Sequence, residues 1–114
     1  MGNPYRGEVD LVINGAPCVM RLSLGALAGL EQRLGADGLV PMIERFEAGR
    51  FTSQDLIALL HAGLQGGGWD GSEADLAAAE IEGGAIVAAQ AAGRLLQVSF
   101  ALPSEAEDDG SAAD

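Results

Sequence analysis

The chain has 114 residues, the size of one domain, and 48% of them are hydrophobic, which is enough apolar material to build a core. Lysine is absent, and six arginines stand against 17 carboxylates, so the formal net charge is −11. Nucleic-acid affinity rests on clustered cations that neutralise phosphates. This charge balance therefore argues against nucleic acid as a direct partner and against binding to anionic membrane surfaces.

The sequence shows no targeting or membrane signal. No basic segment followed by an apolar run opens the chain, and no apolar stretch approaches the ~20 residues that a membrane helix needs. We therefore expect a cytoplasmic protein. Cys18 is the single cysteine, which rules out an internal disulfide, and we interpret it as a small buried hydrophobe on a strand.

Two alternating segments predict a β-hairpin near the N-terminus. Apolar and polar residues alternate over 7–13 and again after Gly15, with the period of two of half-buried strands. Asn14 and Gly15 between them both tolerate positive φ, which is the strongest short signal of a hairpin turn. A two-residue turn would pair Ile13 with residue 16, and a four-residue loop would pair it with residue 18. Either register leaves one apolar face that helices must cover.

After Leu24 the apolar spacing changes to the three and four residues typical of helices, and glycines divide the rest of the chain. Thr52 followed by Asp55 forms a capping-box pattern at the clearest helix start. The expected helices run from Leu24 to Gly35, from Gly38 to Gly49, from Thr52 to Gly66, from Ser72 to Gly83, and over about 84–100. The predicted fold class is therefore α+β and mostly α, with an N-terminal hairpin packed on four to five short helices.

The ends of the chain differ in composition from its middle. We expect residues 1–6 to be a loose leader, 7–102 to form a single domain, and 103–114 to be a disordered acidic tail with almost no large hydrophobes. The tail holds five of the 17 carboxylates. Twelve carboxylates and six arginines remain before it, a net charge of about −6 for the folded part.

No catalytic, cofactor-binding or metal-binding constellation is evident. His61 is the single histidine and has no obvious catalytic partner, so we interpret it as a residue of a helix face. One histidine and one cysteine are too few for an ordinary zinc site. The run Gly66-Gly67-Gly68 lacks the lysine and the preceding strand of a phosphate-binding loop, and we interpret it as a helix stop. We therefore expect a protein that is not an enzyme and holds no cofactor or metal.

Two features are candidates for binding another protein. Trp69, in a glycine-rich turn, either packs onto the core or serves as an interface anchor, a role in which tryptophan is enriched. The final helix is apolar around much of its circumference, so it needs two neighbours, one of which could be another subunit or a client protein. Its candidate contact residues are Val87, Ala91, Leu95 and Val98. A second stripe of the same helix, which we expect to pack at close range through small residues, contains Ile86, Ala89, Gly93, Leu96 and Phe100.

The order of these features resembles the small tail protein family of gene transfer agents, the phage-like particles of alphaproteobacteria. The resemblance covers about residues 3–102. The segments that carry it are Asn3-Pro4-Tyr5-Arg6-Gly7-Glu8-Val9, Leu24-Gly25-Ala26-Leu27-Ala28-Gly29-Leu30-Glu31, Leu34-Gly35, Gly49-Arg50-Phe51, Leu60-His61-Ala62-Gly63-Leu64 and Gly83-Gly84. That family is classed with phage tail assembly chaperones and is also labelled as a tail tube family.

The resemblance implies a non-enzymatic role in building a phage-like tail, with the tape measure protein or other phage tail proteins as partners. Three functions follow as hypotheses. The chain is a tail assembly chaperone that binds the tape measure protein, or a structural tail component retained in the particle, or a small regulatory or ligand-binding domain. The resemblance favours the chaperone, because tube subunits need more β-sheet than one hairpin to close a ring. Association with further copies of the chain stays open.

Overall fold

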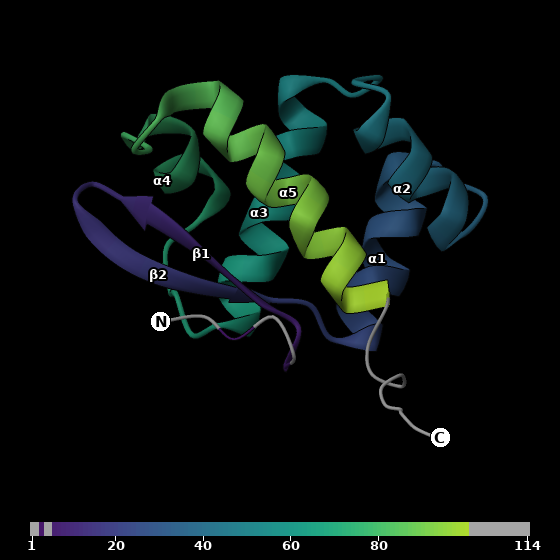
Figure 1. Ribbon diagram of the computed structural model, residues 1–114, viewed down its shortest axis with the longest axis horizontal. Helices are drawn as coiled ribbons and strands as arrows, with labels where there is room; N and C mark the ends of the chain where they lie inside the picture. Colours follow the sequence, from purple (N-terminus) through teal and green to yellow (C-terminus); the bar gives the residue numbers. More distant parts are fainter. Residues whose placement is uncertain (1–2, 4–5, 101–114) are drawn as a thin grey trace.

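The structure is a computed structural model that describes residue 3 and residues 6–100. An antiparallel hairpin opens the fold and five helices follow it (Figure 1). The elements are β1 (Glu8–Ile13), β2 (Ala16–Arg21), α1 (Leu24–Leu34), α2 (Leu39–Glu47), α3 (Ser53–Gly66), α4 (Glu73–Ala78) and α5 (Gly84–Phe100). This arrangement confirms the predicted fold class of a mostly helical α+β protein.

The hairpin has the register of the two-residue turn. Ile13 pairs with Ala16, Leu11 with Cys18 and Val9 with Met20, so the alternative four-residue loop is wrong. Asn14 and Gly15 adopt φ values of 51° and 80°, which the mirror-image turn of a tight hairpin requires. The buried face of the hairpin consists of Val9, Leu11, Ile13 and Met20.

Local capping interactions explain where the helices start and stop. The Thr52 hydroxyl accepts the Asp55 N–H, and the Asp55 carboxylate accepts the Thr52 N–H, which confirms the predicted capping box. Ser72 and Asp75 repeat this arrangement at the start of α4. At the end of α1, Gly35 takes the left-handed conformation that favours glycine, with φ 66°.

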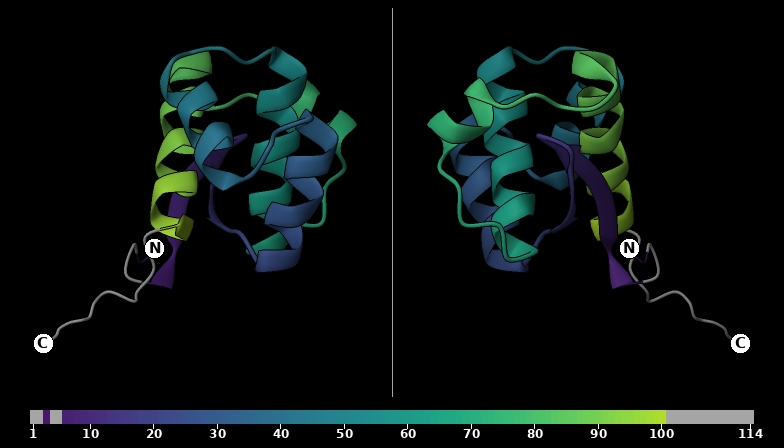
Figure 2. Two further views of the ribbon diagram at one scale, coloured as in Figure 1. Left: turned by 90° about the vertical axis from the view of Figure 1, so that its right-hand side faces the viewer. Right: turned by 90° about the vertical axis from the view of Figure 1, so that its left-hand side faces the viewer.

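A single core joins the hairpin to the helices. Helix α5 packs against β1, α2 and α3, while α1 lies against α3 on the other side of the molecule (Figure 2). The side chains of Met20, Met42, Leu59, Leu64 and Leu95 have no exposed surface. Met42 of α2 is therefore one of the central core residues.

Glycine permits the closest contacts between these layers. A Cβ atom at Gly63 in α3 would lie 2.5 Å from Cδ2 of Leu95 and 3.1 Å from Cβ of Met20. The absence of a side chain at this position therefore lets α5 and β2 approach α3 at the same place.

The chain itself covers part of each edge of the hairpin. Because Ile13 and Ala16 flank a two-residue turn, Val12 in β1 and Val19 and Arg21 in β2 direct their peptide groups away from the partner strand. On the β1 side, the segment 80–82 bonds to the strand: Glu82 N–H donates to the Val12 carbonyl at 3.1 Å, and Asn14 N–H donates to the Glu80 carbonyl at 2.8 Å.

Part of the β2 edge is covered by the end of α3. Cβ atoms at Gly66 and Gly67 would lie 1.9 Å from the Arg21 oxygen and 1.8 Å from the Val19 oxygen, so the helix backbone sits directly against these carbonyls. Pro17, nearer the turn, has no N–H to offer a further strand. The glycine run therefore does more than stop a helix, as the sequence suggested, because it brings the helix end onto the strand.

Two predictions fall at the ends of the chain. Within the expected leader, the Asn3 carbonyl accepts the Arg6 and Glu8 N–H groups, which holds this residue at the start of β1. The other leader residues at 1–2 and 4–5, and the expected acidic tail over 103–114, lie outside the described residues. Among the helices that the structure describes, none is both long enough and apolar enough to cross a membrane.

Candidate functional site

The candidate contact residues of α5 lie mainly in the chain's own core. Leu95 has no exposed surface and lies against Gly63 of α3, and Ala91 is 7% exposed. Val98 is partly buried against the same core, and Val87 is 38% exposed. The second neighbour that the apolar helix needs is therefore supplied within the chain, and Val87 is the most accessible of the four residues to a partner.

The second stripe of α5 does not form the expected close contact. Leu96 is buried, but Ile86 is 72% exposed and a Cβ atom at Gly93 would meet no atom within 4 Å. The prediction of tight packing at Gly93 is wrong. Close approach to α5 instead occurs at Gly63 of α3, where the small residue belongs to the neighbouring helix.

Trp69 packs onto the core beside α3. Its side chain is partly buried, and its ring meets the His61 ring edge to face with centroids 6.2 Å apart. A Cβ atom at Gly71 would lie 2.3 Å from the indole, so the ring covers this glycine. The backbone N–H of Trp69 also donates a hydrogen bond to the Leu64 carbonyl at the end of α3. This geometry is that of a residue fixing a turn, and a role of Trp69 in binding a partner stays a prediction.

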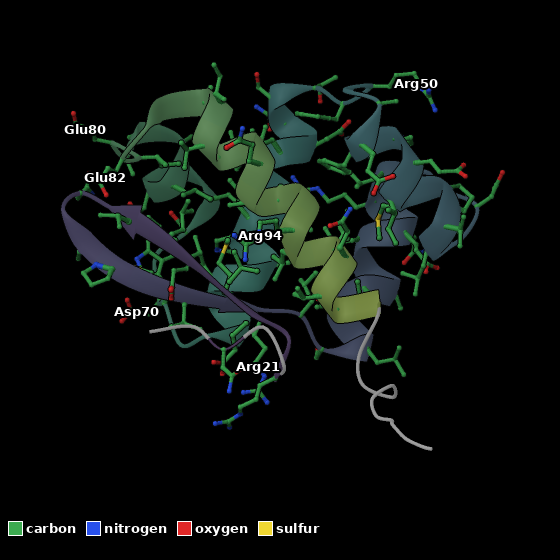
Figure 3. All side chains as sticks on the ribbon, viewed as in Figure 1. Arg21, Arg50, Asp70, Glu80, Glu82 and Arg94 are labelled. Atoms are coloured by element: carbon green, nitrogen blue, oxygen red, sulfur yellow. The ribbon has the colours of Figure 1, made fainter. Side chains whose placement is uncertain are left out.

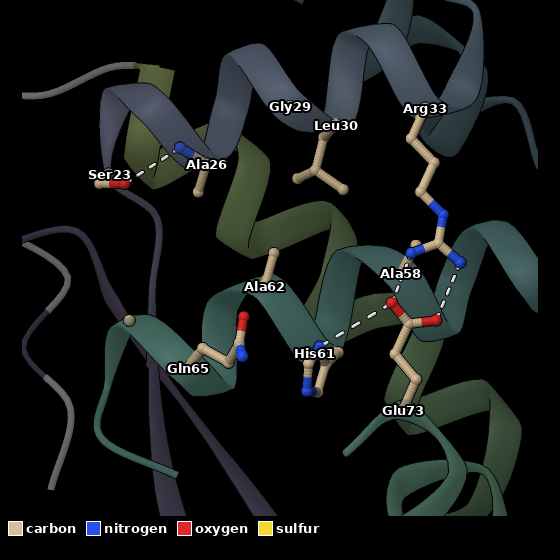
Figure 4. Close-up of a pocket in the computed structure, with 11 residues that line it drawn as sticks. Ser23, Ala26, Gly29, Leu30, Arg33, Ala58, His61, Ala62, Gln65 and Glu73 are labelled. Carbon is tan, nitrogen blue, oxygen red and sulfur yellow. Dashed lines mark hydrogen bonds and ion pairs between the residues drawn. The ribbon is translucent and has the colours of Figure 1, made fainter. Parts of the chain in front are cut away.

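A groove with a volume of about 440 Å³ runs between α1 and α3 (Figure 4). Small side chains make its walls, since Ala26 and Gly29 on α1 face Ala58 and Ala62 on α3, and Leu30 points into it. Small residues on both helices leave the space that larger side chains would fill. The remaining lining residues are Ser23, Arg33, His61, Gln65, Gly66 and Glu73.

Polar groups from three elements close one end of this groove. Arg33 of α1 holds both carboxylate oxygens of Glu73 at the start of α4, with Nη2 2.8 Å from Oε1. His61 of α3 places Nδ1 3.9 Å from Glu73 Oε2 and Nε2 2.8 Å from the Gly71 carbonyl. A carbonyl only accepts hydrogen bonds, so Nε2 carries a proton. The hydrogen bond from Arg33 lowers the pKa of Glu73, and the carboxylate in turn raises the pKa of Arg33.

These polar groups stabilise the fold and are not arranged as an acid–base pair. The Glu73 carboxylate is bound by a guanidinium, and His61 is held by a backbone oxygen. The Ser23 hydroxyl caps α1 by accepting the Ala26 N–H. Within the described part of the chain, no group of three His, Cys, Asp or Glu residues could hold a metal ion. The sequence had indicated no convergent polar groups, but the fold brings three together that satisfy one another.

A second concave region lies where α4 meets the N-terminal parts of α3 and α5. Its cavity of about 280 Å³ is mostly apolar and has no charged lining residue. It is lined by Ser53, Leu56, Ile57, Leu60, Leu76, Ala77, Ala79, Ile81, Gly84, Ala85 and Ala88. Sequence reasoning missed this site because three separate segments form it. The small residues between the Gly66-Gly67-Gly68 run and Ala88 were the sequence signal that could have indicated a concave region here.

This apolar cavity shares two lining residues with an acidic one. Ile81 and Gly84 also line a cavity of about 690 Å³ beside the hairpin turn, together with Glu80 and Glu82. Neither carboxylate has a hydrogen bond or ion pair within the described residues. Both side chains point outward at the hairpin-turn end of the molecule, whereas Arg21 and Arg50 lie far from them (Figure 3). The pattern Glu-Ile-Glu was a sequence signal for this strand-like segment, whose Ile81 forms a bridge with Ile13.

Comparison with known proteins identifies the family. The model of the family described as "Phage tail tube protein, GTA-gp10" matches residues 6–101, which is nearly all of the described structure. The searches of curated proteins and of solved structures found no match. The matched segment contains the hairpin, all five helices and both concave regions. The chain therefore belongs to the GTA-gp10 family of phage tail proteins of gene transfer agents.

Proposed function

We propose that this chain is a non-enzymatic tail assembly chaperone of a gene transfer agent and binds the tape measure protein while the tail is built. It would act in the cytoplasm of the bacterial host, before the particle is released. Membership of a phage tail family supports the tail-related part of the proposal. The helical fold with two concave regions supports a binding role.

The observation that carries the proposal is that the chain's own segments cover part of each hairpin edge. A subunit that builds a tube wall by strand pairing needs free peptide groups along an edge strand. Here the segment 80–82 bonds to β1, and Gly66 and Gly67 press against the outward carbonyls of β2. Strand pairing with a neighbour along these parts of the edges would require the contacts to open. A chaperone that binds through its helices needs no such rearrangement.

A retained structural role is the second candidate, and the family's description as a tail tube protein favours it. Quantitative mass spectrometry of purified particles separates the two roles. A chaperone is absent from mature particles or present far below the stoichiometry of tube subunits. Presence at the stoichiometry of the tube would contradict the chaperone proposal.

Coexpression with the tape measure protein of the same gene transfer agent tests the chaperone directly. We expect the tape measure protein to be recovered in the supernatant as a complex with this chain and to aggregate when expressed alone. An unrelated acidic protein of similar size serves as the control for a general effect of net charge. The proposal fails if the tape measure protein is equally recovered without this chain and the two proteins do not copurify.

The hypothesis of a small ligand-binding domain has the groove between α1 and α3 as its site. Because Arg33 and Glu73 satisfy each other at the end of this groove, the geometry leaves few free polar groups to orient a ligand. A thermal-shift screen with small molecules would support this hypothesis by a specific hit that the variant Ala62→Leu, which narrows the groove, abolishes.

A further inference from the structure

The geometry points to one docking site for the client: the apolar groove between α3, α4 and α5, continued by the acidic cavity at Glu80 and Glu82. The occupant is an amphipathic helical segment of another tail protein that carries apolar side chains followed by arginine or lysine. This inference rests on the proposed function, because it assigns the surface and the client chemistry of the same binding activity.

The floor of the groove is apolar surface that the chain's own packing leaves open. Leu76 and Ala88 are buried beneath it, whereas Ala77 and Ala85 line it and are exposed. Contiguous apolar surface in a concave region gains free energy when an apolar side chain replaces water. Alanines on α4 and α5 keep the groove shallow enough at its rim for a helix to approach.

Charge decides which amphipathic segment fits. Ile81 and Gly84 belong to both cavities, so a segment that fills the apolar groove and extends past them reaches the carboxylates of Glu80 and Glu82. Neither carboxylate has a partner in the described structure, and no arginine lines either cavity. A basic group on the client would meet two unpaired negative charges, whereas an acidic group would be repelled.

The groove between α1 and α3 lacks this complementarity. Its single acidic lining residue, Glu73, is already held by Arg33. A basic segment entering that groove would have to displace an existing ion pair. The two concave regions therefore differ in the client that they favour, and only the groove at α4 selects a basic one.

Two helical peptides of about 18 residues test the site on the full chain, independently of the tape measure protein. Both carry leucine and alanine on one face, and the other face carries arginine in one peptide and glutamate in the other. We expect the arginine peptide to bind, to shift the amide resonances of Ala77, Ile81 and Ala85, and to bind more weakly as salt is added. The glutamate peptide should not bind.

Matched variants locate the interaction. Ala77→Arg places a bulky cation in the groove and should weaken binding at least tenfold, whereas Ala78→Arg adds the same charge one residue away and should change it about twofold. The double variant Glu80→Gln/Glu82→Gln should weaken binding about tenfold. Its control, Asp37→Asn/Glu44→Gln, removes the same charge elsewhere and should have little effect.

The outcomes separate the site from the proposed function. Equal binding of both peptides, resonance shifts at Ala26 and Ala62 instead, or equal effects of the matched variants would overturn the docking site. If Ala77→Arg abolishes peptide binding but the tape measure protein never copurifies with the unmodified chain, the site stands and the chaperone proposal fails. If the tape measure protein copurifies equally with Ala77→Arg and Ala78→Arg, the chaperone proposal stands and this site is wrong.

Discussion

A Cβ atom on Gly67 would lie 1.8 Å from the carbonyl oxygen of Val19, so the end of α3 touches the edge of β2 without any intervening side chain. A Cβ atom on Gly66 would likewise lie 1.9 Å from the carbonyl oxygen of Arg21. The obstacle in both cases is the backbone of a paired strand, which cannot move away at low cost. These two contacts cover the Val19–Arg21 part of the sheet edge, where a neighbouring strand could not pair without displacing the end of α3.

Gly67→Ala should therefore destabilise the protein by about 3 kcal/mol, because the helix end must shift off the strand. Gly93→Ala is the matched control within α5. Its Cβ atom meets nothing within 4 Å, so we expect a gain of about 0.5–1 kcal/mol from the higher helix propensity of alanine. Urea denaturation followed by circular dichroism measures both. Equal stability of Gly67→Ala and the unmodified chain would show that the contact is not present in solution.

Leu95 and Val87 should respond very differently to truncation. Leu95 has no exposed surface, so Leu95→Ala should cost about 2–5 kcal/mol through lost packing and a cavity. Val87 is 38% exposed, and Val87→Ala should cost less than about 1 kcal/mol. Chemical denaturation of the isolated protein checks the pair. A small loss of stability for Leu95→Ala would contradict its burial and would support the role in binding a partner that the sequence suggested.

The ion pair of Glu73 with Arg33 predicts a pH dependence of stability. The pKa of Glu73 in the folded protein is lowered from its ordinary value of 4.5, chiefly by the hydrogen bond from Arg33. A lowered pKa means that the carboxylate stabilises the fold above about 4.5, and that this contribution is lost as the pH falls through the folded-state pKa. Glu73→Gln should therefore be less stable than the unmodified chain at neutral pH, with the difference shrinking in acid.

Denaturant titrations at several pH values between about 3 and 7 measure this difference. Glu44→Gln is the control, because the Glu44 side chain makes no hydrogen bond or ion pair within the described residues. A stability difference for Glu73→Gln that stays constant across this range would argue against the ion pair.

Trp69 provides a spectroscopic test of the turn after α3. Gly71→Ala would place a Cβ atom 2.3 Å from the indole, so the ring must leave its position against His61. We expect the fluorescence of Trp69, the single tryptophan, to move to longer wavelength as the ring becomes more exposed, with a loss of about 1–3 kcal/mol. Ala74→Gly, at an exposed position of α4, should leave the emission unchanged. Unaltered emission of Gly71→Ala would show that the ring does not cover this glycine.

Much of the local structure follows from the sequence. The alternation around Asn14 and Gly15 predicted the hairpin but left two registers open, and Thr52 with Asp55 predicted the start of α3. These features depend on neighbouring residues whose backbone preferences and hydrogen bonds are local. The glycines that end α1 and α3 were predictable for the same reason.

The site was less predictable, because periodicity shows that a helix face is apolar but not which element covers it. From the sequence, the face of α5 with Ala91 and Leu95 suited a partner protein equally well, but in the fold the chain's own core buries both residues. Gly93 suggested close packing of α5, yet the close approach occurs at Gly63 of α3. The sequence of α5 could not show this, because the small residue belongs to the neighbouring helix.

The sequence by itself determined the hairpin, the starts of the helices, the negative charge and the resemblance to a gene transfer agent tail family, because each depends on composition or on residues near one another in the chain. The helix expected from Ser72 to Gly83 ends instead at Ala78, because Ile81 forms a bridge with Ile13. Only the tertiary structure decided that Gly67 faces Val19, that each sheet edge is covered in part, and that Glu80 and Glu82 adjoin an apolar groove. Those relationships join segments that are distant along the chain, and they arise only when one core buries the hairpin and helices together.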